Sequence, residues 1–279
     1  MSGNGEDYKR VPNSEKTWEI DAYPKLLSEI RTALGTDKLI SAAVPGLQRD
    51  MIAFGKDNLP KIAQSVEFLN IMTYDLMNRR DSFTKHHTGL EACKDAIQAY
   101  LANGLPEAKV VLGFAFYVKW FKTDANGGCD TQPIGCKTAL MEDEQGNDLG
   151  QAGAFAWHDE VPSDLSDSFE KAMKMGRYDE RSGGHYFWDG DNHIFWSWDT
   201  PEAMHKKYAT IVQGHRLGGV FAWGLGEDGP EWEHLQALTA EVQQHSYGSV
   251  DYLQNCASTD ESSNRVDHGR GMSQEKEEL

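Results

Sequence analysis

The segment Val66-Glu-Phe-Leu-Asn-Ile-Met-Thr-Tyr-Asp75 decides the fold class of this chain. Its apolar residues predict a buried strand, in which alternation places Asn70, Met72 and Tyr74 on one face. Asp75 then lies at the carboxyl end of the strand, where parallel α/β sheets carry their binding and catalytic groups. A capping Asp and a half-buried Tyr at a strand end explain the pattern equally well. The segment alone therefore leaves both a functional and a structural role open.

Helices and strands alternate on both sides of this segment. An amphipathic helix is predicted over 18–34 and a short buried strand over 38–45. Residues 47–63 are loosely helical, and a helix over 90–101 precedes a strand over 109–117. This alternation predicts an α/β fold with a parallel sheet.

The alternation breaks between about 118 and 200, where the chain is rich in Gly, Asp, Trp and Tyr. We interpret this stretch as a small α+β insertion. Because the C–H faces of sugars pack well on indole rings, its aromatic residues favour a sugar-binding cleft. After it, a helix is predicted over 201–213, a strand over 218–225 and a last helix over 230–244, followed by a polar tail.

Composition excludes several classes of protein. The 279 residues have a net charge of -17, with 27 Lys+Arg against 44 Asp+Glu, so nucleic acid and anionic membrane surfaces are poor partners. The chain has no apolar run near the roughly 18 residues that span a bilayer. The first residues, 1–7, show neither the charged nor the apolar region of a signal peptide.

Gly224-Leu-Gly-Glu-Asp-Gly229 matches the dinucleotide fingerprint Gly-x-Gly-x-x-Gly. However, Glu227 and Asp228 would face a pyrophosphate, which the two negative charges disfavour. No further strand follows to complete a βαβ unit. We therefore expect no nucleotide and no other cofactor at this position.

The histidines and cysteines do not form a metal motif. His86 and His87 lack a carboxylate at ligand spacing, so surface or loop positions are expected for them and no metal is predicted. Cys129 and Cys136 could form a disulfide if the protein is exported. Cys93 and Cys256 could pair or remain free. The last four residues, 276–279, only weakly match an ER-retention signal.

Taken together, these motifs resemble family 18 glycoside hydrolases, the chitinases. The resemblance runs from about Gly3 to Gln244 and rests on two strands and the insertion between them. The matching segments are Met72-Thr-Tyr-Asp75, Gly218-Gly-Val-Phe-Ala-Trp223, Arg177-Tyr-Asp-Glu180, His185-Tyr-Phe-Trp188 and Ser197-Trp-Asp199.

The resemblance implies hydrolysis of β-1,4-linked N-acetylglucosamine by a substrate-assisted retaining mechanism, with chitin or chito-oligosaccharides as partners. It implies that Tyr74 bonds the acetamido carbonyl and that Asp75 contacts the sugar across the scissile bond. Trp223 would form the floor of the reacting subsite, lined by Met72. Tyr117 and Lys119 occupy positions where the family often carries a Tyr and an Arg facing the cleft.

The family's catalytic acid is the Glu of an Asp-x-x-Asp-x-Glu strand, and this motif is absent from the sequence. Asp164-Leu-Ser-Asp167-Ser-Phe-Glu170 is one residue too long and lies in the insertion. The segment Gly3–Tyr8 resembles the loop that follows the acid strand in the family. The resemblance therefore implies an N-terminally incomplete chitinase that is inactive alone, with an inactive chitin- or oligosaccharide-binding protein as the alternative.

The implied fold is a partial (β/α)8 barrel containing about its last four strands. We expect 1–119 and 200–250 to form this half barrel, 120–199 to form the α+β insertion, and 251–279 to be a disordered acidic tail. The resemblance also implies an extracellular location for the full-length family member.

Overall fold

The computed structural model describes residues 11–229 and 231–257, with side chains described as far as His245. The chain divides into a compact unit up to Leu238 and a second unit from Thr239 onward. The predicted site residues all lie in the first unit.

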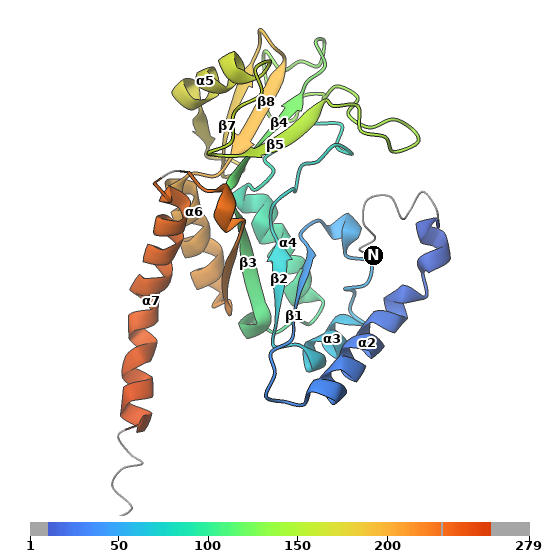
Figure 1. The fold of residues 1–279 in the computed structure, drawn as a ribbon, viewed down its shortest axis with the longest axis vertical. Helices are drawn as coiled ribbons and strands as arrows, with labels where there is room; N and C mark the ends of the chain where they lie inside the picture. The colour runs from blue at the N-terminus through green and yellow to red at the C-terminus, as the bar shows by residue number, and fades with distance from the viewer. Residues whose placement is uncertain (1–10, 230, 258–279) are drawn as a thin grey trace, which may run out of the picture. The chain divides into compact units, whose positions relative to one another are not determined.

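The first sheet consists of four strands in the order β1-β2-β3-β9 (Figure 1). The strands are β1 (Ser41–Pro45), β2 (Phe68–Met72), β3 (Val110–Ala115) and β9 (Gly219–Trp223). Every neighbouring pair is parallel, which confirms the predicted parallel α/β sheet. Their carboxyl ends therefore lie at one edge of the sheet.

The helices of the first unit alternate with these strands. They are α2 (Glu19–Leu34), α3 (Leu59–Ser65), α4 (Leu90–Ala102) and α6 (Pro201–Lys207), the last continued by the π-helix η4 (Tyr208–Gln213). Short 3-10 turns complete the connections: η1 (Asn13–Lys16), η2 (Gln48–Asp50), η3 (Glu107–Lys109) and η5 (Leu225–Glu227).

One face of the parallel sheet packs against these helices. Leu69, Ile71, Leu112 and Phe114 are completely buried in this main core. Gly113 lies on the opposite face of β3, where a Cβ atom would meet Ile71 O at 2.7 Å and the Phe221 ring at 2.8 Å. The alternation of bulky and small residues along β3 thus separates a helix-covered face from a face on which the Phe221 ring packs directly against the strand.

The insertion between β3 and β9 forms a second sheet of five strands in the order β5-β4-β8-β7-β6 (Figure 1). Its neighbouring strands are antiparallel. The elements are β4 (Tyr117–Lys122), β5 (Ala152–Ala156), α5 (Ser166–Met175), β6 (Arg177–Asp179), β7 (Gly184–Asp189) and β8 (Ile194–Trp198). The α+β character predicted for this stretch is confirmed.

The predicted strand over 109–117 was wrong at its end. Strand β3 stops at Ala115, and Tyr117 begins the insertion's sheet, paired with Ala156. The Phe116 N–H donates to Trp223 O at 2.8 Å, which closes the ladder between β3 and β9. Since β3 leads almost directly into β4, the sequence shows one continuous apolar run and no boundary between two sheets.

The last helix is longer than predicted. Helix α7 (Glu233–Ala257) includes 251–257, which we expected to belong to the disordered tail. Val250, Leu253 and Ala257 continue a helical spacing past the expected end at Gln244. The remaining predicted tail, 258–279, lies outside the described residues.

The disulfide that the sequence suggested for Cys129 and Cys136 is present within the insertion. Cys93 is free and buried in α4, and its thiol donates to Thr73 O at 3.2 Å. Cys256 lies in the part of α7 whose side chains are not described.

Among the described helices, none has the length and apolar character needed to cross a membrane.

Candidate functional site

A small aromatic cluster lies at the carboxyl edge of the parallel sheet, on the face opposite the helices. Tyr74, Ala115 and Tyr117 are buried in it, with Met72 and Phe221 packed against them. The Tyr74 ring meets the Tyr117 ring edge-on at 6.1 Å and the Phe221 ring at 6.0 Å between centroids. Strand β2 and the first residue of β4 thus bring Met72, Tyr74 and Tyr117 together.

Strand β2 ends before Thr73, whose side chain, rather than its backbone, forms the hydrogen bonds to β3. The Thr73 hydroxyl donates to Gly113 O at 2.6 Å and accepts from Gly113 N–H at 3.1 Å. Asp75 follows with a φ of 53°, a left-handed conformation that Asp tolerates better than most residues. From this turn the Asp75 side chain reaches Tyr117 and Lys119 of β4.

The carboxylate of Asp75 is held by two donors from β4. The Tyr117 hydroxyl and Lys119 Nζ each donate to Asp75 Oδ1 at 2.8 Å. The Asp75 side chain is 54% exposed and the Lys119 side chain 12% exposed. Within the described residues no partner is found for Asp75 Oδ2, so this oxygen can accept a hydrogen bond from a ligand.

Tyr74 presents a protonated hydroxyl. Burial raises the pKa of Tyr74 to about 12, and the negative charges of Asp75 and Glu227 add to the shift. Across the described part of the chain the Tyr74 hydroxyl has no hydrogen-bond partner, although it is buried. A buried donor without an acceptor is unfavourable, so this hydroxyl is suited to bind the oxygen of a ligand.

Tyr117, the second tyrosine of the cluster, differs from Tyr74 because its hydroxyl already donates to Asp75. Burial is the first cause that raises the pKa of Tyr117, and the charge of Asp75 together with its hydrogen bond raises it further. Tyr117 therefore remains a neutral donor to Asp75 rather than a base.

Trp223 ends β9 with an indole that is 57% exposed. It shares a strand face with Phe221, which packs into the aromatic cluster, and it lies beside Ala115 of β3. A large exposed aromatic side chain next to polar groups is suited to stack on an apolar ligand face.

Glu227 is a residue of this edge that sequence analysis assigned no role. Burial raises the pKa of Glu227, while a hydrogen bond from Trp223 opposes the shift. Its negative charge is also among the smaller causes that raise the pKa of Tyr74 and of Tyr117. The sequence feature that could have identified Glu227 is its position four residues after Trp223, in the short turn η5 that follows the carboxyl end of β9.

The neighbouring Asp228 has a structural role instead. It accepts hydrogen bonds from the backbone of Gly229, His234 and Leu235, and His234 Nδ1 lies 2.7 Å from its Oδ1. These bonds fix the start of α7 after Glu227. The segment that matches the dinucleotide motif thus contains a carboxylate bonded to the backbone at the start of α7, a role that the sequence did not predict.

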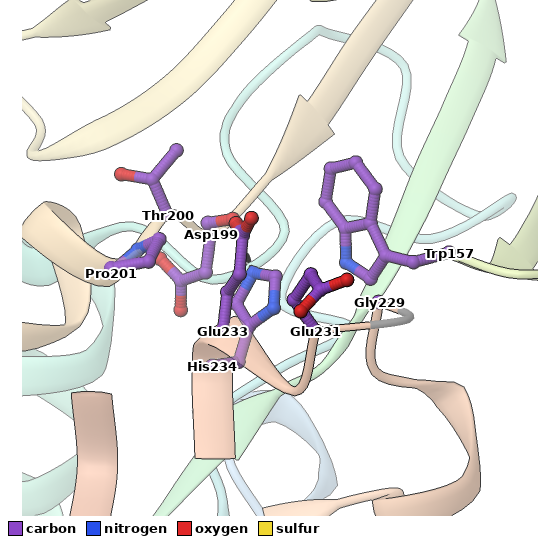
Figure 2. A pocket seen from close by; sticks show the side chains of 8 residues that line it. All are labelled: Trp157, Asp199, Thr200, Pro201, Gly229, Glu231, Glu233 and His234. Carbon is purple, nitrogen blue, oxygen red and sulfur yellow. Dashed lines mark hydrogen bonds between the residues drawn. The ribbon is translucent and has the colours of Figure 1, made fainter. Parts of the chain in front are cut away.

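A cavity of about 350 Å³ lies next to this loop (Figure 2). The residues that line this cavity are Trp157, Asp199, Thr200, Pro201, Gly229, Glu231, Glu233 and His234. Trp157 stacks on His234 with 5.4 Å between ring centroids. The predicted site residues are not among those lining it, so this cavity is distinct from the aromatic cluster.

His86 and His87 lie in a loop as expected, but they are buried rather than on the surface. His86 Nε2 lies 3.2 Å from Asp179 Oδ2 in the insertion, and His87 packs on Tyr117. The loop between β2 and α4 runs against the insertion's sheet, which covers both rings. No group of three metal-binding side chains occurs among the described residues.

Comparison with known proteins shows the family to which the chain is related. The family model described as "Glycosyl hydrolases family 18" matches residues 7–228. Chitinase B of Serratia marcescens is 25% identical over 271 residues, covering 79% of this chain and 54% of that protein. Chitinase A1 of Niallia circulans is 28% identical over 244 residues, covering 77% and 32%.

Solved chitinases share the fold. A Rhizomucor miehei chitinase superposes with a TM-score of 0.62 at 21% identity, covering 78% of this chain and 65% of that one. A plant class V chitinase mutant from Cycas revoluta, solved in complex with (GlcNAc)3, gives 0.53 at 18% identity and covers 82% and 63%. The chain spans about half the length, or less, of the curated relatives it matches. Since the family model covers most of its residues, the chain belongs to family 18 of the glycosyl hydrolases.

Proposed function

We propose that these residues form the sugar-binding part of a chitinase active site, which binds N-acetylglucosamine oligomers of chitin. The observation that carries the proposal is the convergence of Tyr74, Asp75, Tyr117 and Lys119 beside the exposed indole of Trp223. Figure 1 shows β2, which Tyr74 and Asp75 follow, and β4, which contains Tyr117 and Lys119. We further propose that this four-stranded sheet corresponds to half of a (β/α)8 barrel.

Each side chain has a chemical property that fits its proposed role. The Tyr74 hydroxyl is a neutral donor without a partner among the described residues, and it would donate to the acetamido carbonyl. Asp75 would accept from the sugar through Oδ2 while Oδ1 stays bonded to Tyr117 and Lys119. Trp223 would stack on the sugar ring, with Met72 beside it.

In the substrate-assisted mechanism, the acetamido oxygen attacks the anomeric carbon while an acid protonates the leaving oxygen. Tyr74 and Asp75 would hold the acetamido group in position for this attack. The acid must come from a carboxyl group in the Asp-x-x-Asp-x-Glu motif, which the 279 residues do not contain. Lack of a general acid typically lowers the rate by about 10²–10⁴-fold.

The 279 residues alone are therefore expected to bind chitin oligomers without turnover. The missing motif favours a second candidate, a non-hydrolytic chitin-binding protein that uses the same side chains. Both candidates share the binding site and differ in whether an acid is supplied from elsewhere. The disulfide between Cys129 and Cys136 supports the further proposal of an extracellular location.

The test is calorimetric titration of the chain with an N-acetylglucosamine hexamer, together with a fluorogenic trimer assay for hydrolysis. We expect binding without turnover. Trp223→Ala should weaken binding about fivefold, since loss of an aromatic stacking partner removes about 1 kcal/mol. Trp18→Ala is the matched control, because Trp18 is equally large and 67% exposed but lies at the start of α2. Equal affinity of the two variants would contradict the proposal.

A further inference from the structure

His87 is buried directly behind the candidate sugar site, and no role has been assigned to it. Its residue exposure is 0%, and among the described residues neither ring nitrogen has a hydrogen-bond partner. An imidazole buried in this way is unfavourable compared with an apolar side chain of similar shape. Any role of this side chain must therefore come from the contacts of its ring and from its backbone rather than from bonds of its ring nitrogens.

The backbone of His87 ties the site to the insertion. Its N–H donates to Ser197 Oγ of β8 at 3.2 Å, and its carbonyl oxygen accepts from Leu76 N–H at 2.8 Å. Leu76 directly follows Asp75, the residue with the left-handed turn. One end of the Asp75 turn is thus fixed by His87.

The ring of His87 supports Tyr117. The two ring centroids are 5.3 Å apart with an interplanar angle of 45°. Tyr117 uses its hydroxyl to bond Asp75, so a tilt of the whole side chain about its χ1 angle would carry the hydroxyl away from Asp75. His87 therefore contacts Tyr117, one of the two donors to the Asp75 carboxylate, and Leu76, the residue that follows Asp75.

The ring is uncharged. Burial lowers the pKa of His87 well below its ordinary value, and the positive charges of Lys119 and Lys207 and the neighbouring His86 lower it further. A neutral ring is required here because a third positive charge beside these two lysines would be repelled. The side chain that packs against Tyr117 is therefore an uncharged aromatic ring.

We propose that His87 is a positioning residue for sugar binding, whose neutral ring holds the Tyr117 hydroxyl against Asp75. This inference rests on the proposed function of the same site. It predicts that the ring is needed and the ring nitrogens are not. It also predicts that His87 acts on the sugar only through Tyr117.

The experiment measures the affinity for an N-acetylglucosamine hexamer by calorimetry, together with the melting temperature of each variant. His87→Ala should weaken binding about tenfold, the effect of losing one hydrogen bond to a charged group. His87→Phe keeps a ring without nitrogens and should restore the affinity to within about threefold of the unmodified chain. The matched control is His86→Ala, because His86 is also buried but packs on Tyr186 and Phe195.

A double-mutant cycle separates positioning from a general loss of stability. Tyr117→Phe removes the hydroxyl but keeps the ring, and it should weaken binding about as much as His87→Ala. Adding His87→Ala to Tyr117→Phe should then change the affinity less than about twofold. Additive effects, or a His87→Phe variant as weak as His87→Ala while still folded, would overturn the inference. Failure of the unmodified chain to bind would instead overturn the proposed function.

Discussion

Lys119 Nζ donates to Asp75 Oδ1 at 2.8 Å, across the junction between the parallel sheet and the insertion. Asp75 follows β2 and Lys119 lies in β4, 44 residues later in the sequence. The bond therefore makes the insertion part of the candidate sugar site rather than an addition beside it.

This bond can be tested by replacing the lysine. Lys119→Met should weaken binding of an N-acetylglucosamine hexamer about threefold, because a half-exposed ion pair contributes up to about 1 kcal/mol. Lys119→Arg keeps the charge and should bind more tightly than Lys119→Met. Calorimetric titration measures both, with Lys122→Met on the same strand as the control. A Lys122→Met effect as large as that of Lys119→Met would contradict the assignment.

Gly113 makes the close approach between β3 and the Phe221 ring possible. Gly113→Ala would place a Cβ atom 2.7 Å from Ile71 O, which forces the strand or the ring to move. We expect urea unfolding to show a loss of about 1–3 kcal/mol. Gly219→Ala is the matched control, since its nearest neighbour would be Val111 Cγ2 at 3.9 Å. The assigned packing is contradicted if both variants unfold at the same urea concentration.

A buried ion pair anchors α6 behind the site. Lys207 Nζ bonds Asp199 Oδ2 and Thr88 O, and the side chains of Lys207 and Asp199 are completely buried. Lys207→Met should lower the free energy of unfolding by about 3–5 kcal/mol, because it leaves Asp199 charged and buried. The double variant Lys207→Met with Asp199→Asn should recover part of this loss. Thermal unfolding measures both, and a double variant less stable than Lys207→Met would contradict this explanation.

Asp179 makes the stability of the insertion depend on pH. The hydrogen bond from His86 and those from Ser182 and Arg181 hold the pKa of Asp179 far below its ordinary value. The ionised form is therefore favoured in the folded chain, and its contribution to stability is present above about pH 4 and lost as the pH falls below that.

We therefore expect Asp179→Asn to be less stable than the unmodified chain at pH 6, with the difference shrinking toward pH 3. Urea unfolding at the two pH values measures this difference. The exposed Asp191→Asn, in the same sheet region, is the control. A difference between Asp179→Asn and the unmodified chain that grows toward low pH would contradict the assignment.

Local periodicity predicted most of the fold because each parallel strand is a short apolar run between amphipathic helices. It placed Tyr74 and Asp75 at the carboxyl edge of the sheet. The observed end of β2 at Met72 confirms that position. It failed at Tyr117, where β3 runs almost directly into β4 and no polar break marks the change of sheet. The end of α7 was also missed, because a polar composition outweighed the helical spacing of its few apolar residues.

The partners around the site could not be predicted from the sequence. The burial of His87 depends on a loop that lies against β4 and β8, and loops carry no periodic signal. The same holds for Glu227, whose negative charge raises the pKa of Tyr74 from the turn after β9. Contacts between residues more than 30 positions apart, such as Tyr117 with Asp75, depend on tertiary structure.

The most direct test of the account is a crystal structure of the chain with an N-acetylglucosamine trimer. We predict one sugar ring over the Trp223 indole, with its acetamido oxygen within about 3.2 Å of the Tyr74 hydroxyl and its hydroxyls near Asp75. A trimer bound elsewhere, for example in the cavity beside Trp157, with Tyr74 and Trp223 free of sugar, would contradict the central claim.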